Sequence, residues 1–518
     1  MARGGAAAGA GLAATALGLG LGELTAAFLD PGASPIAGVG GAIIDAAPPG
    51  AKDVAIALFG TSDKLALVLL IGALLLVAGA FTGILEQRRP PWGRVVAGAV
   101  GVAGAAIALT RPDAGVAAWL PSVVGGGVTV LALGFLIRRE RASVTDTPRE
   151  KDTRALSRGR TDGPTRRSFL LWSVGAAAVG VLALAGSTVV RAGSQAVQSV
   201  RNALRLPAPA KTAPPIPPGA QVDVAGMTPV ITPNEAFYRI DTALVVPNVN
   251  PTDWSLRIHG LVANEVTLTW DQLMALPLEE SVTTLMCVSN EVGGDLIGNA
   301  VWLGYPVREL LARAVPAADA DMVLSRSIDG FTASTPIETL TDDRNAILAV
   351  GMNGDPLPLE HGFPVRMVVP GLYGYVSATK WITELEVTRY ADASAYWTQR
   401  GWAPRGPVKL SSRIDVPRSG QTLAAGNTVV AGVAWQQHVG VSGVEVRVDG
   451  GAWQPAQLAP AISDDTWVQW TFPWTASSGQ HQIECRAISA TGQVQTGTVA
   501  PPVPDGATGW DRLSVSVS

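Results

Sequence analysis

The chain has 518 residues, of which 47% are hydrophobic, and its mean hydropathy of +0.27 is high for a soluble enzyme. The formal net charge is only −4, so no global field favours nucleic acid as a partner. Two cysteines are too few for a disulfide framework. The apolar residues concentrate before residue 190, and this asymmetry predicts a membrane region followed by a folded part.

Five segments are long and apolar enough to cross a hydrocarbon core of about 30 Å as helices. They comprise residues 6–29, 65–85, 95–109, 116–137 and 169–190. A further apolar stretch, residues 35–47, is too short to span a bilayer and is expected to be re-entrant or interfacial. We therefore predict a four-helix transmembrane region over residues 1–140 and a fifth transmembrane helix over residues 168–190.

The distribution of arginine predicts the orientation of these helices. Arg88, Arg89 and Arg94 lie between the second and third spans, and a strongly basic loop follows the fourth, over residues 141–167. The intervening loops carry few basic residues, so the N-terminus is expected to be cytoplasmic. Because the number of spans is odd, everything after the fifth is expected to be extracytoplasmic.

The fifth span begins with an export-like sequence. Thr165-Arg166-Arg167-Ser168-Phe169-Leu170 matches the twin-arginine pattern S/T-R-R-x-F-L. The alternative is a chance arginine pair on a basic loop. Twin-arginine export moves folded proteins, which suits a domain that is loaded with a cofactor before export. No A-x-A-like cleavage site follows, so we expect the helix to remain as an anchor.

Residues 191–225 are predicted to be a linker, in which six prolines between 207 and 218 favour a semi-rigid spacer. Residues 226–398 mix short strands and helices without a regular βαβ repeat, which predicts an α+β domain. Residues 254–260 alternate as a strand, 269–274 look like a capped helix start, and 307–314 have helical spacing.

The last part of the chain, residues 399–518, is nearly all strand and turn. About seven alternating strands over about 110 residues are typical of an immunoglobulin-like β-sandwich. Cys485 lies on one of these strands, and we expect it to be a core residue rather than a ligand.

Cys287 is the most informative residue of the chain. A single thiolate suits a soft transition metal when a cofactor supplies the other sulfur ligands. The alternative is an ordinary buried cysteine. About 75 residues later the chain reads H-G-F-P-V-R from His361 to Arg366, followed by a glycine-rich run and by Lys380-Trp381. Cationic groups beside glycine-rich backbone favour a large anionic cofactor.

The pairing of T-L-M-C-V-S-N (284–290) with H-G-F-P-V-R-M-V-V-P-G (361–371) and a following K-W resembles the sulfite oxidase family of molybdopterin enzymes. The resemblance runs from about Asn234 to the C-terminus. It implies Mo-molybdopterin as the cofactor, with two dithiolene sulfurs and the Cys287 sulfur on molybdenum. It also implies that the immunoglobulin-like domain makes contacts in a homodimer.

The resemblance assigns roles residue by residue. Cys287 is the implied metal ligand, and Cys287, Tyr238 and Arg239 are the implied catalytic residues. The implied cofactor-binding residues are Asn234, Tyr238, Arg239, Cys287, Ser327, His361, Arg366, Gly374, Tyr375, Ser377 and Lys380. For His361 the alternative is a structural loop histidine, whereas Trp302 and Asp355 are expected to serve packing and a turn.

One departure from the family pattern concerns the substrate. Animal and plant sulfite oxidases follow the ligand cysteine with Asn-Arg-Arg, whereas this chain has Asn290-Glu291-Val292. An acidic residue in place of a cation disfavours sulfite, so we expect oxygen-atom transfer with a neutral sulfoxide or N-oxide as the small-molecule substrate, and sulfite-like oxidation is the alternative. The bacterial branch of the family, which includes a periplasmic methionine sulfoxide reductase, is the nearer resemblance.

The electron supply is expected to come from outside the chain. The histidines are His259, His361, His438 and His481, all beyond the predicted spans, and no C-x-x-C-H or iron–sulfur spacing exists. No haem or iron–sulfur cluster is therefore expected, and a cytochrome or quinone-linked protein is the expected partner. Two other functions stay open: a non-catalytic adhesion protein that retains the fold, and a transporter-associated subunit with Glu23 as its main interior ionisable residue.

Overall fold

The computed structural model describes residues 2–29, 31–48, 58, 63–111, 114–145, 166–192 and 195–518. The chain forms two compact units. Unit 1 comprises Met1–Ala196 with Ala243–Pro247, and unit 2 comprises Val197–Thr242 with Asn248–Ser518. Most of the predicted basic loop, residues 146–165, lies outside the described residues, as do residues 49–57 and 59–62.

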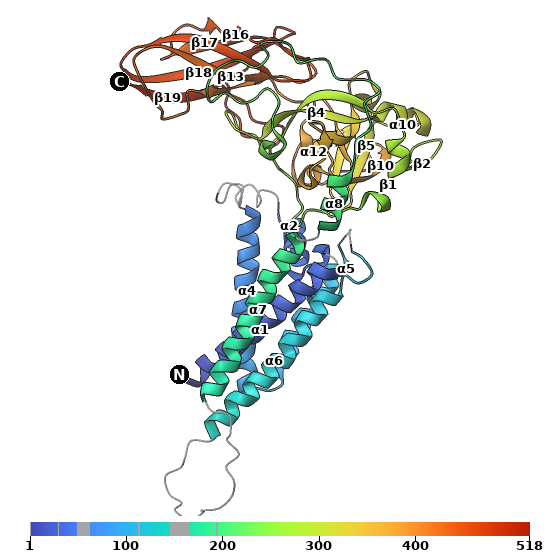
Figure 1. The fold of residues 1–518 in the computed structure, drawn as a ribbon, viewed down its shortest axis with the longest axis vertical. Coiled ribbons are helices and arrows are strands. Elements are labelled where there is room, and N and C mark those ends of the chain that lie inside the picture. Colours follow the sequence, from blue (N-terminus) through green and yellow to red (C-terminus); the bar gives the residue numbers. More distant parts are fainter. Residues whose placement is uncertain are drawn as a thin grey trace, which may run out of the picture. The chain divides into compact units, whose positions relative to one another are not determined.

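Unit 1 is helical (Figure 1). Its helices are α1 (Ala2–Leu29), α2 (Pro35–Ala46), α4 (Asp63–Arg88), α5 (Trp92–Leu109), α6 (Leu120–Thr145) and α7 (Arg166–Ala192), with the short η1 (Pro31–Ala33). Among the described residues, five of these helices are long and apolar enough to cross a membrane, and α2 is too short, as predicted. Helix α6 begins at Leu120 rather than at residue 116, and its first turn contains Pro121, which needs no backbone donor there.

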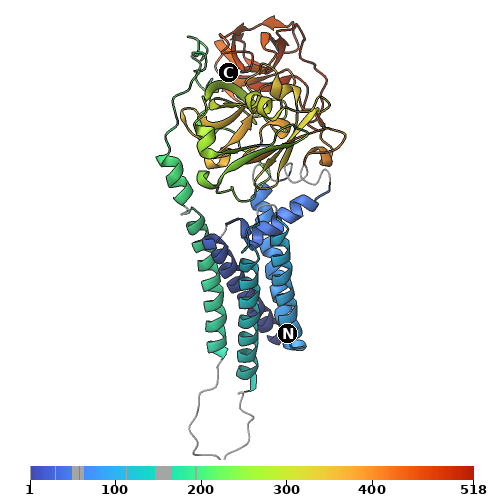
Figure 2. The same ribbon diagram turned by 90° about the vertical axis from the view of Figure 1, so that its right-hand side faces the viewer.

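Small residues allow α1 to pack closely against α4, α6 and α7, which surround it (Figure 2). A Cβ atom added at Gly11 would lie 2.0 Å from the carbonyl oxygen of Gly79 in α4. One added at Gly20 would lie 2.1 Å from the carbonyl oxygen of Gly180 in α7. Close backbone approach through glycine is the usual way in which apolar helices associate without a hydrophobic driving force between them.

The first part of unit 2 contains one antiparallel sheet and one mixed sheet. One sheet has the order β3 (Glu279–Met286), β4 (Ile297–Pro306), β7 (Ile347–Met352), β8 (Asp355–Pro356), and β9 (Arg366–Val368) also pairs with β7. The other has the order β2 (Val266–Thr269), β1 (Ser255–Gly260), β10 (Ile382–Thr388), β5 (Met322–Ser327), β6 (Thr332–Pro336). Strands β1 and β10 are parallel, and the other pairs are antiparallel.

Short helices connect these strands. They are α8 (Gln195–Ala203), α9 (Trp270–Met274), α10 (Val307–Ala314), α11 (Glu338–Thr341) and α12 (Gly374–Ser377), with the 3₁₀ turns η3 (Asn234–Ala236), η4 (Pro251–Asp253), η5 (Leu359–His361) and η6 (Thr398–Arg400). The predicted cap on α9 is confirmed: Thr269 and Gln272 form a reciprocal capping box. Helix α10 has the predicted bounds and buries Leu310 and Leu311 on its apolar face.

The second part of unit 2 is a β-sandwich (Figure 1). One sheet has the order β11 (Ser411–Val416), β13 (Gly426–Trp435), β17 (Val468–Ala476), β16 (Gln457–Leu458). The other has the order β12 (Thr422–Leu423), β19 (Asp511–Val517), β18 (Gly479–Ser489), β14 (Val441–Val448), β15 (Gln454–Pro455). Their inner faces form one core around Trp470, and Cys485 is fully buried in it, which confirms the prediction for that residue.

The proline-rich segment differs from the predicted spacer. The Ala210 amide donates to the Leu278 carbonyl at 2.7 Å, and the Glu280 amide donates to the Lys211 carbonyl at 2.8 Å. Lys211 and Glu279 form a parallel bridge. The segment therefore covers the otherwise unpaired edge of β3, because an open edge strand leaves backbone groups without partners. Proline is compatible with such an extended edge position.

Candidate active site

Cys287 lies at the start of the loop that joins β3 to β4. Its amide donates to the Leu296 carbonyl at 2.9 Å, and its carbonyl accepts from the Asn290 amide at 3.1 Å. The side-chain oxygen of Asn290 closes the loop by accepting from the Leu296 amide at 2.8 Å. The Cys287 side chain is 8% exposed, and neither cysteine of the chain forms a disulfide. Backbone hydrogen bonds thus hold the thiol in one place.

A tyrosine hydroxyl and a glycine lie beside the end of β3. A Cβ atom added at Gly374 would lie 3.7 Å from the Met286 carbonyl oxygen and 3.9 Å from the Tyr238 hydroxyl. Burial raises the pKa of Tyr238 well above its usual range, and a negative charge on Cys287 raises that pKa further. Tyr238 therefore keeps its proton and can act only as a neutral hydrogen-bonding group near the thiol.

A second tyrosine, Tyr373, lies within electrostatic range of Cys287 and was missed by sequence reasoning. Burial raises the pKa of Tyr373 to about 12, and the charge of Cys287 contributes in the same direction. Its hydroxyl accepts a hydrogen bond from the Lys409 amide at 3.3 Å. The signal that could have identified it is its position directly before Gly374 in the P-G-L-Y-G run.

Arg366 is a buried cation, with a side chain only 4% exposed. Its guanidinium carbon lies 5.1 Å from the centre of the Trp302 ring, and its Nη1 donates to the His361 carbonyl at 3.1 Å. Burial lowers the pKa of Arg366 to about 10, so it is still charged near neutral pH. Among the described residues no carboxylate forms an ion pair with it. A buried charge without a counter-charge is costly, so this position suits an anionic ligand.

A second cationic group, Lys380, is paired with an acid. Its Nζ donates to Asp241 Oδ2 at 2.8 Å and to the Glu360 carbonyl at 2.9 Å. Arg239, whose side chain is 40% exposed, donates to the same Asp241 oxygen at 3.0 Å. Burial lowers the pKa of Lys380 to about 8, although Asp241 opposes this shift. Asp241 was not among the predicted site residues, and nothing in its local sequence marks it.

His361 is buried between the two cations. Burial, followed by the charges of Arg366 and Lys380, lowers the pKa of His361 to about 3, so the ring is neutral near pH 7. Its Nε2 donates to the Asn234 carbonyl at 3.2 Å. Gly362 has φ of +110°, and a Cβ atom there would lie 2.9 Å from Arg366 Cβ and 3.1 Å from Lys380 Cβ. Only glycine fits this turn, which brings the two cationic residues together.

Three predicted residues use their side chains differently or lie apart. The Ser377 hydroxyl donates to the Tyr373 carbonyl at 2.9 Å, and the Tyr375 hydroxyl donates to the Ala403 carbonyl at 2.7 Å. Both side chains are therefore already bonded to backbone. Ser327 is buried at the end of β5. Cofactor contacts by these residues stay a prediction.

The residues around Cys287 fit a metal whose other ligands come from a cofactor. Within the part of the chain that the structure describes, no group of three or more His, Cys, Asp or Glu side chains could hold a metal by itself. The thiol and the buried Arg366 instead both lie close enough to the neutral Tyr238 to influence its pKa. This donor set suits a thiolate-ligated metal in an anionic organic cofactor.

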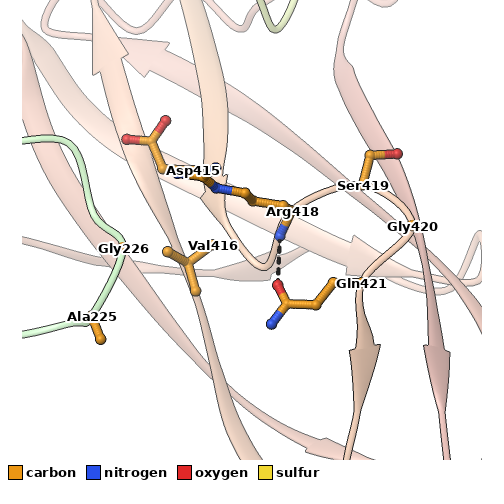
Figure 3. Close-up of a pocket in the computed structure, with 8 residues that line it drawn as sticks. All are labelled: Ala225, Gly226, Asp415, Val416, Arg418, Ser419, Gly420 and Gln421. Carbon is orange, nitrogen blue, oxygen red and sulfur yellow. Dashed lines mark hydrogen bonds between the residues drawn. The ribbon is translucent and has the colours of Figure 1, made fainter. Parts of the chain in front are cut away.

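A surface pocket of about 470 Å³ lies elsewhere in unit 2, at the β11–β12 turn (Figure 3). It is lined by Ala225, Gly226, Asp415, Val416, Arg418, Ser419, Gly420 and Gln421. The Arg418 amide donates to the Gln421 side-chain oxygen at 3.0 Å and closes the turn. None of the predicted site residues lines this pocket, so it is separate from the Cys287 region.

Comparison with known proteins agrees with this geometry. Residues 243–397 match the family model for the oxidoreductase molybdopterin binding domain, and residues 411–484 match that for a bacterial Ig domain. The mitochondrial sulfite oxidase of Homo sapiens is 30% identical over 321 residues, covering 52% of this chain and 58% of that protein. The uncharacterized oxidoreductase YuiH of Bacillus subtilis (strain 168) is 30% identical over 198 residues, covering 38% of this chain and 95% of YuiH.

Among solved structures, the sulfane dehydrogenase SoxCD from Paracoccus pantotrophus is 24% identical, with a TM-score of 0.46, covering 53% of this chain and 75% of that chain. The match of residues 243–397 and the relatives together identify a molybdopterin-binding oxidoreductase. The chain belongs to the sulfite oxidase family of these enzymes. It spans only 58% of the length of the mitochondrial sulfite oxidases that it matches.

Proposed function

We propose that the protein is a membrane-anchored, extracytoplasmic molybdopterin-dependent oxidoreductase that performs oxygen-atom transfer. The observation that carries this proposal is that the Cys287 thiol and Arg366, a buried cation that has no carboxylate partner among the described residues, both lie close enough to the buried Tyr238 hydroxyl to influence its pKa. A metal ligand and a site for an anionic group are thereby placed together. A protein that used this fold only for adhesion would have no need of either.

Different residues of the chain would bind different parts of the cofactor. Cys287 supplies one thiolate to molybdenum. Arg366 and Lys380 bind anionic groups of the pterin, and the fork of Arg366 suits a phosphate. Neutral His361 orients this side of the site through its bond to Asn234. When bound, the cofactor supplies two-electron oxygen-atom chemistry. The protonated Tyr238 hydroxyl can donate a hydrogen bond to a polar group that approaches Cys287.

The proposed substrate is a neutral sulfoxide or N-oxide. The loop after Cys287 carries no arginine pair that would hold an anion. Glu291 itself is exposed, so its contribution is smaller than an interior charge would make. At about 6 Å a unit charge is worth roughly 2–3 kcal/mol at a dielectric constant of about 20, but only about 0.7 kcal/mol in water. The lack of an arginine pair therefore weakens the binding of an anionic substrate more than the charge of Glu291 does.

We expect the enzyme to reduce a neutral sulfoxide or N-oxide with an artificial electron donor more efficiently than it oxidises sulfite. The comparison is of kcat/KM for the two reactions in the purified full-length protein. Glu291→Gln serves as the control and should change the ratio by no more than about threefold, as the screened charge predicts. Sulfite oxidation that exceeds the reduction of every tested oxide would show the substrate assignment to be wrong.

The membrane anchor is proposed from the helices of unit 1. Leu69 and Val77 of α4 and Leu171 and Leu182 of α7 are each more than 60% exposed, as lipid-facing side chains would be. Arg166 and Arg167 begin α7, so the twin-arginine pattern lies at the start of a candidate span. We propose a cytoplasmic N-terminus and export of unit 2 by the twin-arginine route.

Replacing Arg166 and Arg167 by lysine should leave the first four spans inserted but retain the catalytic part in the cytoplasm, because twin-arginine export requires the arginine pair. Protease protection in intact spheroplasts measures this. The matched control is Arg88→Lys with Arg89→Lys, a basic pair at the end of α4, which should not change exposure of the domain. Normal external cleavage of the double Arg166/Arg167 variant would contradict the proposed route.

Electrons are proposed to be exchanged with a separate cytochrome or quinone-linked protein, and the immunoglobulin-like domain is proposed to mediate a homodimer. A transport role is disfavoured by the environment of Glu23. Its carboxylate accepts from the Ser34 hydroxyl at 2.8 Å and from the Ile36 amide at 2.9 Å. Glu23 therefore binds the start of α2, which is a structural role.

A further inference from the structure

The immunoglobulin-like part of unit 2 forms hydrogen bonds with β3 just before Cys287. Thr284 lies in β3, three residues upstream of the thiol, and is 2% exposed. Its amide donates to the Asp465 carbonyl at 3.0 Å. Its hydroxyl accepts from the Trp467 amide at 2.9 Å, and its carbonyl accepts from Gln437 Nε2 at 3.3 Å. Each polar group of this residue thus receives a partner from the β-sandwich.

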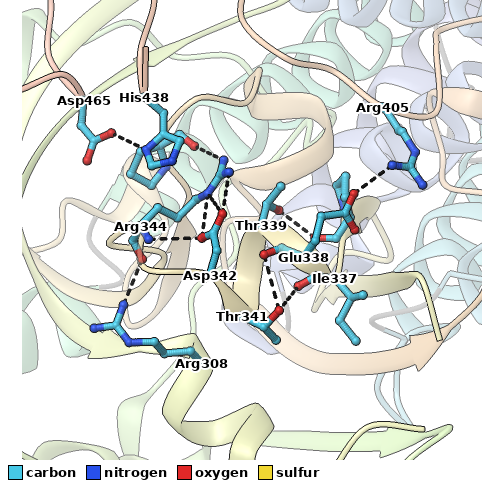
Figure 4. Close-up of polar contacts among 12 residues, drawn as sticks. Arg308, Ile337, Glu338, Thr339, Thr341, Asp342, Arg344, Arg405, His438 and Asp465 are labelled. Carbon is cyan, nitrogen blue, oxygen red and sulfur yellow. Dashed lines mark hydrogen bonds and ion pairs between the residues drawn. The ribbon is translucent and has the colours of Figure 1, made fainter. Parts of the chain in front are cut away.

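The sandwich residues in this contact are themselves held in place. His438 Nδ1 and Asp465 Oδ1 lie 3.1 Å apart, and Figure 4 shows this pair next to Arg344. The His438 amide donates to the Asp464 carbonyl at 2.8 Å. The indole of Trp467 is buried and donates to the Val230 carbonyl at 2.9 Å. The loops that bind Thr284 are therefore fixed supports rather than loose surface segments.

The same sandwich also holds the far side of the Cys287 loop. Arg413 of β11 is buried, and its Nη1 donates to the Gly294 carbonyl at 2.8 Å while its Nε donates to Asp415 Oδ1 at 2.7 Å. Gly293 has φ of +77°, and a Cβ atom there would lie 2.6 Å from Asp511 Oδ1. Glycine is thus required where the loop crosses the start of β19.

We infer that the immunoglobulin-like domain positions the Cys287 sulfur, with Thr284 and Arg413 as positioning residues on the two sides of the loop. The inference rests on the proposed ligand role of Cys287. Residues 287–296 join β3 to β4, and the β-sandwich binds Thr284 just before them and Gly294 near their end. These contacts join segments more than 100 residues apart in sequence. A metal ligand must be held to within about 0.5 Å, which requires support of this kind.

Arg413→Lys tests the inference, because lysine keeps the charge beside Asp415 but cannot also hold the Gly294 carbonyl through a second nitrogen. We expect amide hydrogen exchange over residues 287–296 of the full-length protein to rise about tenfold. We also expect the electron paramagnetic resonance spectrum of its molybdenum in the +5 state to shift, because the sulfur moves. Arg486→Lys is the control: its ion pair with Glu445, at 2.7 Å, lies within the sandwich and should leave both readouts unchanged.

Thr284→Val provides an independent test if the Arg413 variant does not fold. Valine keeps the shape of the side chain but loses the Trp467 bond, together with the bond that the Thr284 hydroxyl donates to Asn299 Oδ1 of β4 at 3.0 Å, so exchange over the same residues should again rise. Asn299→Ala, which removes only the β4 partner, is the matched control and should raise exchange less. Unchanged exchange and an unchanged resonance spectrum in both folded variants would overturn the inference. Raised exchange in the variants, with wild-type protein that binds no molybdenum, would leave the positioning intact and show instead that the ligand role of Cys287 is wrong.

Discussion

Cys287→Ser should abolish activity and strongly weaken the retention of molybdenum while the fold persists. Serine is nearly isosteric, and the loop is held by backbone bonds to Leu296 and Asn290 that do not involve the sulfur. A hydroxyl is a poor substitute for a thiolate ligand at a soft metal. Metal analysis and thermal unfolding of the purified variant measure the two effects separately.

Cys485→Ser is the matched control, because that thiol is fully buried in the β-sandwich core beside the Ser412 hydroxyl. This second variant should keep its molybdenum and its activity, although a new buried hydroxyl can lower its stability by about 1–3 kcal/mol. Full activity of Cys287→Ser would show that the ligand assignment is wrong.

Arg366→Met should yield protein with less than about a tenth of the normal cofactor content. Hydrogen bonds to a charged group contribute roughly 1.5–3 kcal/mol, which corresponds to a factor of about 10 to 150 in affinity. Cofactor-free Arg366→Met should nevertheless be at least as stable as cofactor-free wild type. Methionine fills the space beside Trp302 and removes a buried charge that has no carboxylate partner among the described residues.

The control for this variant is Arg326→Met in the same domain. Arg326 pairs with Glu384 Oε2 at 2.7 Å, and its side chain is 42% exposed, so its loss should change neither cofactor content nor stability by much. Pterin fluorescence, metal analysis and thermal unfolding provide the three readouts. Normal cofactor content in Arg366→Met would contradict the role of this arginine as the anchor for an anionic group.

Local sequence patterns were sufficient to predict several helices. Unbroken apolar runs predicted five long helices, and the spacing of Leu310 and Leu311 predicted α10 with its bounds. The two motifs around Cys287 and Arg366 predicted that these residues belong to one site, and in the structure both lie close enough to Tyr238 to influence its pKa. The roles assigned to them stay predictions.

The sequence by itself determined the class of the protein and the nature of its main elements, since periodicity and motif spacing are local properties of the chain. Only the tertiary structure decided that Asp241 pairs with Lys380, that the Tyr373 hydroxyl accepts from the Lys409 amide and that the proline-rich segment covers the edge of β3. The hydrogen bonds between the β-sandwich and Thr284 were also visible only in the tertiary structure. These features depend on side-chain direction and on backbone pairing between distant segments, which leave no periodic trace in the sequence.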